Sequence, residues 1–449
     1  MRPTPWAEYT SIIHSAETVR PTGRVVGLVG LTIEADGPHV QVGDLCLLED
    51  ISGRRRLPAE VVGFRQGRVL LMPIGERQGI GPGWVVTATG ESLTIGVSDA
   101  MLGRVVDALG HPIDGGTAIP ADVQRSLDAS PPHPLHRPRV IDRLNTGVRV
   151  IDTLMTLGKG QRIGLFAGSG VGKSTLLGMI SRTSSADVNV IALVGERGKE
   201  VRDFIERDLG PEGMKRSVTV VCTSDQPALM RLKAAHTATT IAEYFRDRGA
   251  DVMLLVDSIT RWALAQREVG LSIGEPPTTR GFPPSVFAML PRLLERAGRA
   301  SRGSITGVYS VLVEGDDMAE PISDSCRAIL DGHISLSRRL ASQNHFPAVD
   351  VLESISRVAK DVLTREECDL AGMARDILAT YREAEDLISV GAYKRGSSPD
   401  IDRAIDVIKE LTGFLRQQVD EFTDADATWN ALRTILTKQT TDTKNSTAQ

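Results

Sequence analysis

The spacing of apolar positions changes along the chain and divides it into regions of different predicted structure. Between residues 23 and 96, short β-rich runs are separated by glycine, a pattern typical of a small β-barrel. The expected strands are Arg24–Leu31, His39–Val42, Asp44–Leu48, Glu60–Arg65, Arg68–Met72 and Trp84–Thr89. The Pro-rich stretch Pro131–Pro138 follows this region, and we expect a domain boundary near it.

Further along, apolar runs alternate with helical spacing, which favours a mainly parallel sheet covered by helices on both faces. Polar groups follow the apolar runs Val188–Val194, Val218–Cys222, Val252–Val256 and Tyr309–Val313. Because the carboxyl ends of parallel strands share one edge, and ligands bind at that edge in open α/β sheets, these groups should converge on one ligand.

From about Thr364 to Lys438 the spacing is helical, with one interruption at Gly391–Pro399. The expected division is therefore an N-terminal amphipathic segment (1–22), a β-barrel domain (23–96), an α/β domain (97–363), a helical C-terminal domain (364–438) and a polar, disordered tail (439–449). The fold class expected is α/β, with a mainly parallel sheet in the core.

The N-terminal segment places its larger apolar residues on roughly one helical face. These residues are Trp6, Tyr9, Ile12, Ile13 and Ala16. Two interpretations stay open: the helix packs on its own domain, or it docks on a partner or a membrane surface.

Composition narrows the class of protein without deciding its function. The 449 residues are 41% hydrophobic, enough for large cores, and the net charge is −5, which gives no basic footprint for nucleic acid. The Arg54–Arg56 cluster is interpreted as a solvated turn. No apolar run approaches the roughly 18 residues that span a bilayer. The four cysteines have no metal-like spacing and are expected to be reduced, so a cytoplasmic location is favoured.

One stretch carries the strongest chemical signal, because a short apolar run, Ile163–Phe166, leads into a glycine-rich loop and then into helical spacing. The predicted phosphate-binding residues are Ala167, Gly168, Ser169, Gly170, Val171, Gly172, Lys173, Ser174 and Thr175. Glycines let successive N–H groups face one anion, and Lys173 adds a point charge for the outer phosphates. Ala167 replaces the first glycine of the usual pattern, a departure of one methyl group.

Hydrolysis of a nucleotide needs a metal bridge, a group that orients water, and positive charge near the transferred phosphate. Asp257 ends an apolar run and is predicted to act with Ser174 as a Mg²⁺ ligand. Glu196 is the predicted water-activating carboxylate, and Arg197 and Arg261 are predicted to contact the terminal phosphate. A capping or ion-paired role is the alternative for each acid, and a surface ion pair is the alternative for Arg261.

A long stretch beyond the sheet resembles a known family. The run Pro347-Ala-Val-Asp350-Val-Leu-Glu-Ser354-Ile-Ser356 matches the signature of the rotary ATPase alpha/beta superfamily, and Leu102–Gly115 and Gly195–Arg197 also resemble segments of those proteins. Within it, the type III secretion ATPases, including those of flagellar export, are the most similar. The segments that show this similarity are Asp257–Ala263, Gly274–Phe287, Leu293–Gly298, Glu314–Met318 and Leu330–Ile334.

The resemblance implies roles that spacing alone does not give. Arg357 corresponds to an arginine finger that reaches into the neighbouring subunit's site, and Phe346 stands where the family usually has a tyrosine that stacks on adenine. Both halves of a site in one chain allow a closed head-to-tail ring, for which the family implies six subunits. It further implies that residues 97–363 form a P-loop ATPase domain with a RecA-like core, which uses ATP and Mg²⁺ and binds no nucleic acid.

The implied machine is an export apparatus on the inner face of the cytoplasmic membrane. Its implied contacts are a stator or regulator at the N-terminus, a central stalk, export substrates, chaperones and the membrane surface. Three alternatives stay open: a virulence-type secretion ATPase, a catalytic subunit of a rotary ATP synthase, and a nucleotide-binding ring with incidental turnover. An RNA translocase is disfavoured, because no aromatic-plus-basic strand pattern of the kind that stacks bases is present.

Overall fold

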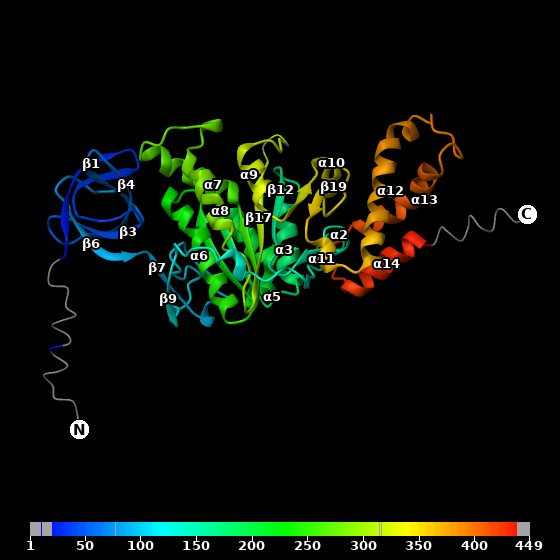
Figure 1. Cartoon of the computed structure of the whole chain (residues 1–449). Helices are drawn as coiled ribbons and strands as arrows, with labels where there is room; N and C mark the ends of the chain where they lie inside the picture. Colours follow the sequence, from blue (N-terminus) through cyan, green and yellow to red (C-terminus); the bar gives the residue numbers. More distant parts are fainter. Residues whose placement is uncertain (1–9, 11–19, 77, 314, 316, 438–449) are drawn as a thin grey trace, which may run out of the picture.

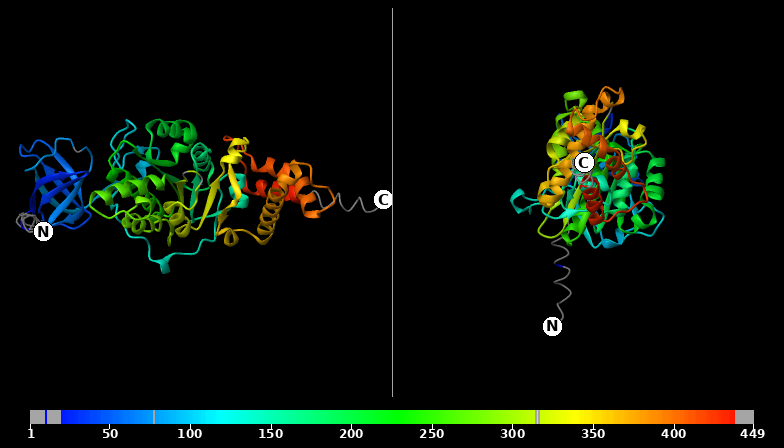
Figure 2. Two further views of the ribbon diagram at one scale, coloured as in Figure 1. Left: turned by 90° about the horizontal axis from the view of Figure 1, so that it is seen from above. Right: turned by 90° about the vertical axis from the view of Figure 1, so that its right-hand side faces the viewer.

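The computed structural model describes residues 10, 20–76, 78–313, 315 and 317–437. A barrel lies at one end of the elongated molecule, a large α/β unit in the middle and a group of helices at the other end (Figures 1 and 2). The expected fold class is confirmed. The N-terminal segment 1–22, apart from residues 10 and 20–22, and the tail 439–449 lie outside the described residues.

The barrel is closed by six antiparallel strands in the order β1-β2-β5-β4-β3-β6. They are β1 (Thr22–Val29), β2 (Thr32–Asp36), β3 (Asp44–Glu49), β4 (Arg56–Arg65), β5 (Arg68–Pro73) and β6 (Val85–Ser92). The predicted strand His39–Val42 was wrong, and β2 was missed. Gly37 has φ +69° and Pro38 lacks an N–H, so the chain turns there and residues 39–42 belong to no strand.

The central sheet has nine strands, in the order β19-β18-β12-β17-β15-β13-β14-β8, with β16 beside β17. They are β8 (Val105–Val106), β12 (Arg162–Ala167), β13 (Val188–Glu196), β14 (Ser217–Thr223), β15 (Asp251–Asp257), β16 (Gly298–Arg299), β17 (Ser304–Leu312), β18 (Gly332–Leu336) and β19 (Val349–Ser356). Only the β16–β17 and β18–β19 pairs are antiparallel. Its inner strands are buried along almost their whole length because helices cover both faces.

Successive residues of each inner strand point to opposite faces and join two different cores. On one face they pack against α6 (Ala228–Asp247), α7 (Ile259–Ser272) and α8 (Pro284–Leu294). On the other they pack against α2 (Arg149–Leu154), α3 (Lys173–Thr183) and the C-terminal helices. The remaining helices of this unit are α4 (Gly198–Asp203), α5 (Gly210–Lys215), α9 (Pro321–Ile329), α10 (Arg338–Ser342) and α11 (Ala359–Val362). Two small sheets pair β7 (Thr94–Val97) with β9 (Val123–Ser126) and β10 (Arg143–Leu144) with β11 (Leu157–Gly158).

The C-terminal region consists of α12 (Arg365–Ser389), α13 (Pro399–Leu415) and α14 (Ala425–Thr437). Thr364 begins α12 through a capping box, in which its hydroxyl accepts from the Glu367 N–H and the Glu367 carboxylate accepts from the Thr364 N–H. The break between α12 and α13 falls where the sequence predicts it. No helix in the described part of the chain has the length and apolarity of a bilayer-spanning segment.

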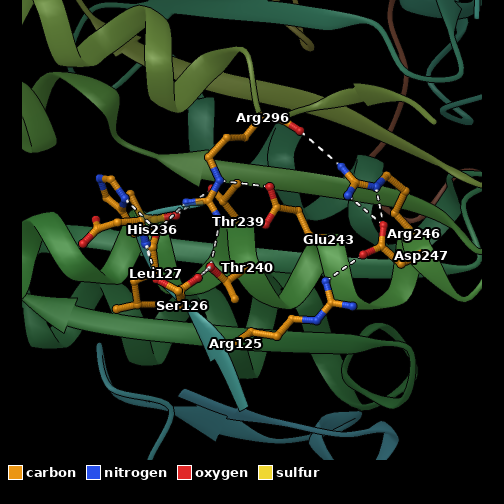
Figure 3. Close-up of polar contacts among 12 residues, drawn as sticks. Arg125, Ser126, Leu127, His236, Thr239, Thr240, Glu243, Arg246, Asp247 and Arg296 are labelled. Atoms are coloured by element: carbon orange, nitrogen blue, oxygen red, sulfur yellow. Dashed lines mark hydrogen bonds and ion pairs between the residues drawn. The ribbon is translucent and has the colours of Figure 1, made fainter. Parts of the chain in front are cut away.

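One buried arginine holds three separate segments of the α/β unit together (Figure 3). The Arg296 guanidinium donates to both carboxylate oxygens of Glu243, at 2.9 and 2.7 Å, to the Leu127 carbonyl at 2.7 Å and to the Thr240 hydroxyl at 2.9 Å. Its side chain is only 2% exposed. A second buried pair, Lys233 of α6 with Glu60 of β4 at 2.7 Å, joins the unit to the barrel.

We expect Glu243→Ala to lower the free energy of unfolding by about 3–5 kcal/mol, because it leaves the Arg296 charge buried without its partner. The matched control is Glu268→Ala, which removes the partner of Arg231 from a pair whose carboxylate is 44% exposed. A pair of that kind contributes at most about 1 kcal/mol. Urea unfolding followed by circular dichroism measures both. Equal losses would contradict the role given to Arg296.

Candidate active site

The glycine-rich loop lies between β12 and α3, at the carboxyl edge of the sheet. Gly170 and Gly172 have φ of +78° and +91°, which residues other than glycine rarely adopt. Gly172 is also the N-cap of α3. The loop N–H groups and the start of an eleven-residue helix together form an anion site. Ala167 is the buried last residue of β12, and its carbonyl accepts from the Val313 N–H at 3.0 Å. It does not adopt a positive φ, so the methyl group is tolerated.

Three predicted residues from three segments meet beside this loop. The Lys173 ammonium donates to the Asp257 carboxylate and lies 3.8 Å from the nearer oxygen of Glu196. The Ser310 hydroxyl donates to the same Asp257 oxygen at 2.5 Å. One cation therefore lies between two carboxylates, in a site where both are buried.

The environment of Glu196 changes the pKa of its carboxyl group. Burial, followed by the negative charge of Asp257, raises the pKa of Glu196 to about 7, although the Lys173 charge opposes the shift. A carboxyl group with a pKa near the working pH suits a general base. Glu196 is also the last residue of β13, not the first after it, because the pairing with β14 shifts register between Val194 and Glu196.

A cavity of about 650 Å³ opens over the loop. Glu196, Arg197 and Arg261 line it together with the loop residues. Arg261 has a buried Nε without a hydrogen-bond partner in the described part of the chain, so its guanidinium has donor capacity left for an anion. Arg197 is 79% exposed and pairs only loosely with Glu200, at 3.9 Å.

Phe346 lies at the mouth of the same loop. Its ring is so near Gly172 that a Cβ placed on that glycine would be 3.6 Å from it, and the side chain is 40% exposed. Its carbonyl accepts from the Gln417 N–H at 2.9 Å, which ties it to the segment after α13. An aromatic face held beside the phosphate loop is suited to stacking on a base.

Arg357 does not join this group. Its N–H donates to the Asp331 carbonyl at 2.9 Å, and the Asp331 N–H donates to the Arg162 carbonyl at 2.8 Å. Arg162 begins β12, whose other end leads into the phosphate loop. A strand of six residues spans about 17–20 Å, so Arg357 lies at the opposite edge of the sheet from its own chain's site.

Sequence reasoning missed several groups of this site. Arg338, Glu200 and Thr260 line the cavity, and Ser310 orients Asp257. Arg338 begins α10 soon after β18 ends, so the rule applied to the other strand ends could have found it. Ser310 is inside an apolar strand, where no spacing signal marks it.

The residues present fit a magnesium ion bound with a nucleotide. Ser174 supplies a hydroxyl to the cavity wall and Asp257 a carboxylate just behind Lys173, and Mg²⁺ prefers such oxygen ligands. The buried Oε1 of Glu196 accepts no hydrogen bond in the described part of the chain, and a water in the site would satisfy it. Nor do three or more His, Cys, Asp or Glu side chains form a metal cage among those residues, so the ion's remaining ligands would come from the nucleotide and water.

Comparison with known proteins agrees with this geometry. Residues 25–90 match the beta-barrel domain of the ATP synthase alpha/beta family, residues 147–356 match its nucleotide-binding domain, and residues 363–434 match the T3SS EscN ATPase C-terminal domain. A flagellum-specific ATP synthase of Bacillus subtilis is 56% identical over 91% of this chain and 94% of its own. The chain belongs to the type III secretion ATPase family.

Two other similar proteins come from type III secretion systems. A type 3 secretion system ATPase of Xanthomonas euvesicatoria is 49% identical over 93% of this chain and 94% of its own. The assembled ATPase EscN of enteropathogenic E. coli is 45% identical, with a TM-score of 0.88 over 92% of this chain and 100% of its own. The resemblance read from the sequence is confirmed, and the chain is an ATPase with a nucleotide-binding domain of the ATP synthase type.

We expect kcat/KM for ATP hydrolysis to rise as the pH increases through about 7, because Glu196 must lose its proton before it can accept one from water. In Glu196→Gln this rise should vanish from the residual rate. The matched control is Glu206→Gln, which changes a carboxyl group that is 56% exposed and pairs with Arg202 at 2.7 Å, and it should keep the rise. A rise that persists in Glu196→Gln would exclude Glu196 as its source.

Proposed function

We propose that this protein hydrolyses MgATP in a homohexameric ring that drives unloading and export of flagellar proteins. The observation that carries this proposal is the division of the site. Lys173, Glu196 and Asp257 meet at one edge of the sheet, and Arg357 lies at the other. A head-to-tail ring brings the Arg357 edge of one subunit to the loop edge of the next.

The chain's own residues then have separate tasks. The loop N–H groups and Lys173 hold the phosphates, and Ser174 and Asp257 hold Mg²⁺, which supplies charge neutralisation on the phosphates. Glu196 orients the attacking water and accepts its proton. Arg197 and Arg261 stabilise charge on the transferred phosphate from the same subunit, and Arg357 does so from the neighbour. Phe346 stacks on adenine.

A flagellar role is preferred because the Bacillus subtilis relative is 56% identical, compared with 49% for the type 3 secretion ATPase of Xanthomonas. A virulence-type secretion ATPase is the second candidate. The solved EscN structures are of an assembled ATPase and of its complex with the central stalk EscO, which supports a ring with a stalk here. A location in the cytoplasm beneath the export apparatus, with a regulator, chaperones and the membrane surface as further contacts, belongs to the same proposal.

We expect Glu196→Gln to bind ATP normally and to hydrolyse it slower by orders of magnitude, because the water loses its orienting carboxylate. Binding of a fluorescent ATP analogue and phosphate release measure the two effects. Unchanged turnover would remove Glu196 from its role and leave a ring with another base.

We expect Arg357→Ala to abolish hydrolysis without unfolding the subunit, because its side chain is exposed and its one hydrogen bond within the described residues is to the Arg327 carbonyl, at 3.3 Å. Mixing it with Lys173→Ala subunits should restore part of the activity, since some interfaces then combine an intact loop with an intact Arg357. No recovery in rings that assemble normally would exclude action between subunits.

A further inference from the structure

The backbone at Arg357 is held more firmly than its side chain. The Arg357 N–H bonds to the Asp331 carbonyl at 2.9 Å, and its guanidinium makes one long contact, 3.3 Å to the Arg327 carbonyl. Gly332 lies so near β19 that a Cβ on it would be 2.3 Å from the Ile355 carbonyl oxygen. The direction in which the arginine leaves the surface is therefore set by how its main chain is fixed against Asp331.

Asp331 is fixed in turn by the first residue of β12. Its two carboxylate oxygens each accept from the Arg162 guanidinium at 3.1 Å, and one also accepts from the Arg162 N–H at 3.0 Å. The Arg162 carbonyl accepts from the Asp331 N–H at 2.8 Å. Four hydrogen bonds join these two residues, and Arg162 forms a further ion pair with Glu295. The two-pronged guanidinium contact fixes direction as well as distance.

The residue before Arg162 adds a second attachment. Gln161 is fully buried, and its side-chain N–H₂ donates to the Asp331 carbonyl at 3.3 Å and to the Ser356 hydroxyl at 3.0 Å. The Ser356 hydroxyl donates onward to the Thr156 carbonyl at 2.8 Å. One amide thus holds the residue that anchors Arg357 and the residue that precedes it.

We propose that Asp331, clamped by Arg162 and Gln161, is a positioning residue that aims Arg357 at the active site of the neighbouring subunit. The inference rests on the proposed function, because it needs Arg357 to act between subunits. Stabilisation of a phosphoryl-transfer transition state depends on placement, and a displacement of 1 Å can cost about a hundredfold in rate. Asp331 contacts no nucleotide, since its carbonyl and carboxylate are bound within its own subunit at the edge opposite the loop.

The first test is Asp331→Ala in the full-length protein, which removes the carboxylate clamp and leaves Arg357 and the loop intact. We expect kcat to fall by about 10- to 100-fold, with unchanged affinity for a fluorescent ATP analogue and unchanged ring assembly by light scattering. The matched control is Asp142→Ala, which breaks an ion pair with Arg299 at 2.7 Å and, within the described residues, has no hydrogen bond or ion pair with Arg357. It should keep kcat within about twofold, as expected for an exposed pair. A normal kcat in Asp331→Ala, or loss of assembly, overturns the proposal.

The second test uses mixed rings, which separate a donor defect from a defect in a subunit's own site. Asp331→Ala mixed with Lys173→Ala should regain activity, because the second chain supplies a well-placed Arg357 to the first chain's intact loop. Asp331→Ala mixed with Arg357→Ala should not, because neither supplies one. Recovery in the second mixture, or in neither, overturns the positioning role.

The outcomes keep this inference apart from the proposed function. If Arg357→Ala retains full activity, the action between subunits fails; if it loses activity and Asp331→Ala does not, only the positioning role fails. Should Asp331→Ala not fold, the same mixtures are made with Asp331→Asn, which keeps the shape of the side chain and loses the charge that pairs with Arg162. The same results then support or overturn the proposal.

Discussion

Strand β12 lies in the middle of the sheet and carries a functional group at each end. Its carboxyl end leads into the phosphate loop, and its first residue, Arg162, binds the segment that holds Arg357. The strand pairs with β17 over all six of its residues and with β18 over four, so neither end can shift without breaking ladder hydrogen bonds. The distance between the phosphate-binding loop and Arg357 is therefore set by the length of one strand, and movement of a loop cannot bring Arg357 to the phosphate-binding loop of its own chain.

Beside the phosphate-binding loop, two carboxyl groups lie next to one lysine. Lys173 is shared by Asp257 and Glu196, and both carboxylates are buried. The closer contact of the lysine is with Asp257, and the pKa of Glu196 is raised because this carboxyl group is buried and lies near the negative charge of Asp257. The buried charges beside the glycine-rich loop thus include a carboxyl group whose pKa, about 7, lies near neutral pH.

A second group of buried charges, around Arg296, has a structural role. Arg296 donates hydrogen bonds to a carboxylate, a carbonyl and a hydroxyl, and we assign it no part in hydrolysis. Its partners come from α6 and from Leu127, the residue after β9, so it connects α6 to the segment that follows the barrel domain in the chain. Lys233, seven residues before Thr240 on α6, continues that connection to Glu60 in the barrel. The buried charges of Arg296, Lys233 and Lys173 each have a carboxylate partner, in the fold as in the site.

The sequence by itself determined the elements and the types of residue at the site. Glycine spacing, continuous apolar runs and the polar residues after them predicted the loop between β12 and α3, the sheet, the helical C-terminal region and the meeting of Lys173, Glu196 and Asp257, because local spacing and the shared edge of parallel strands suffice for these. It failed at His39–Val42, where a turn depends on Gly37 and Pro38, and it did not find Ser310 or Arg338. Only the tertiary structure placed Arg357 at the opposite edge and showed what holds it there. That position depends on strand order and on hydrogen bonds between residues such as Arg162 and Asp331, 169 positions apart in the chain, which no local pattern records.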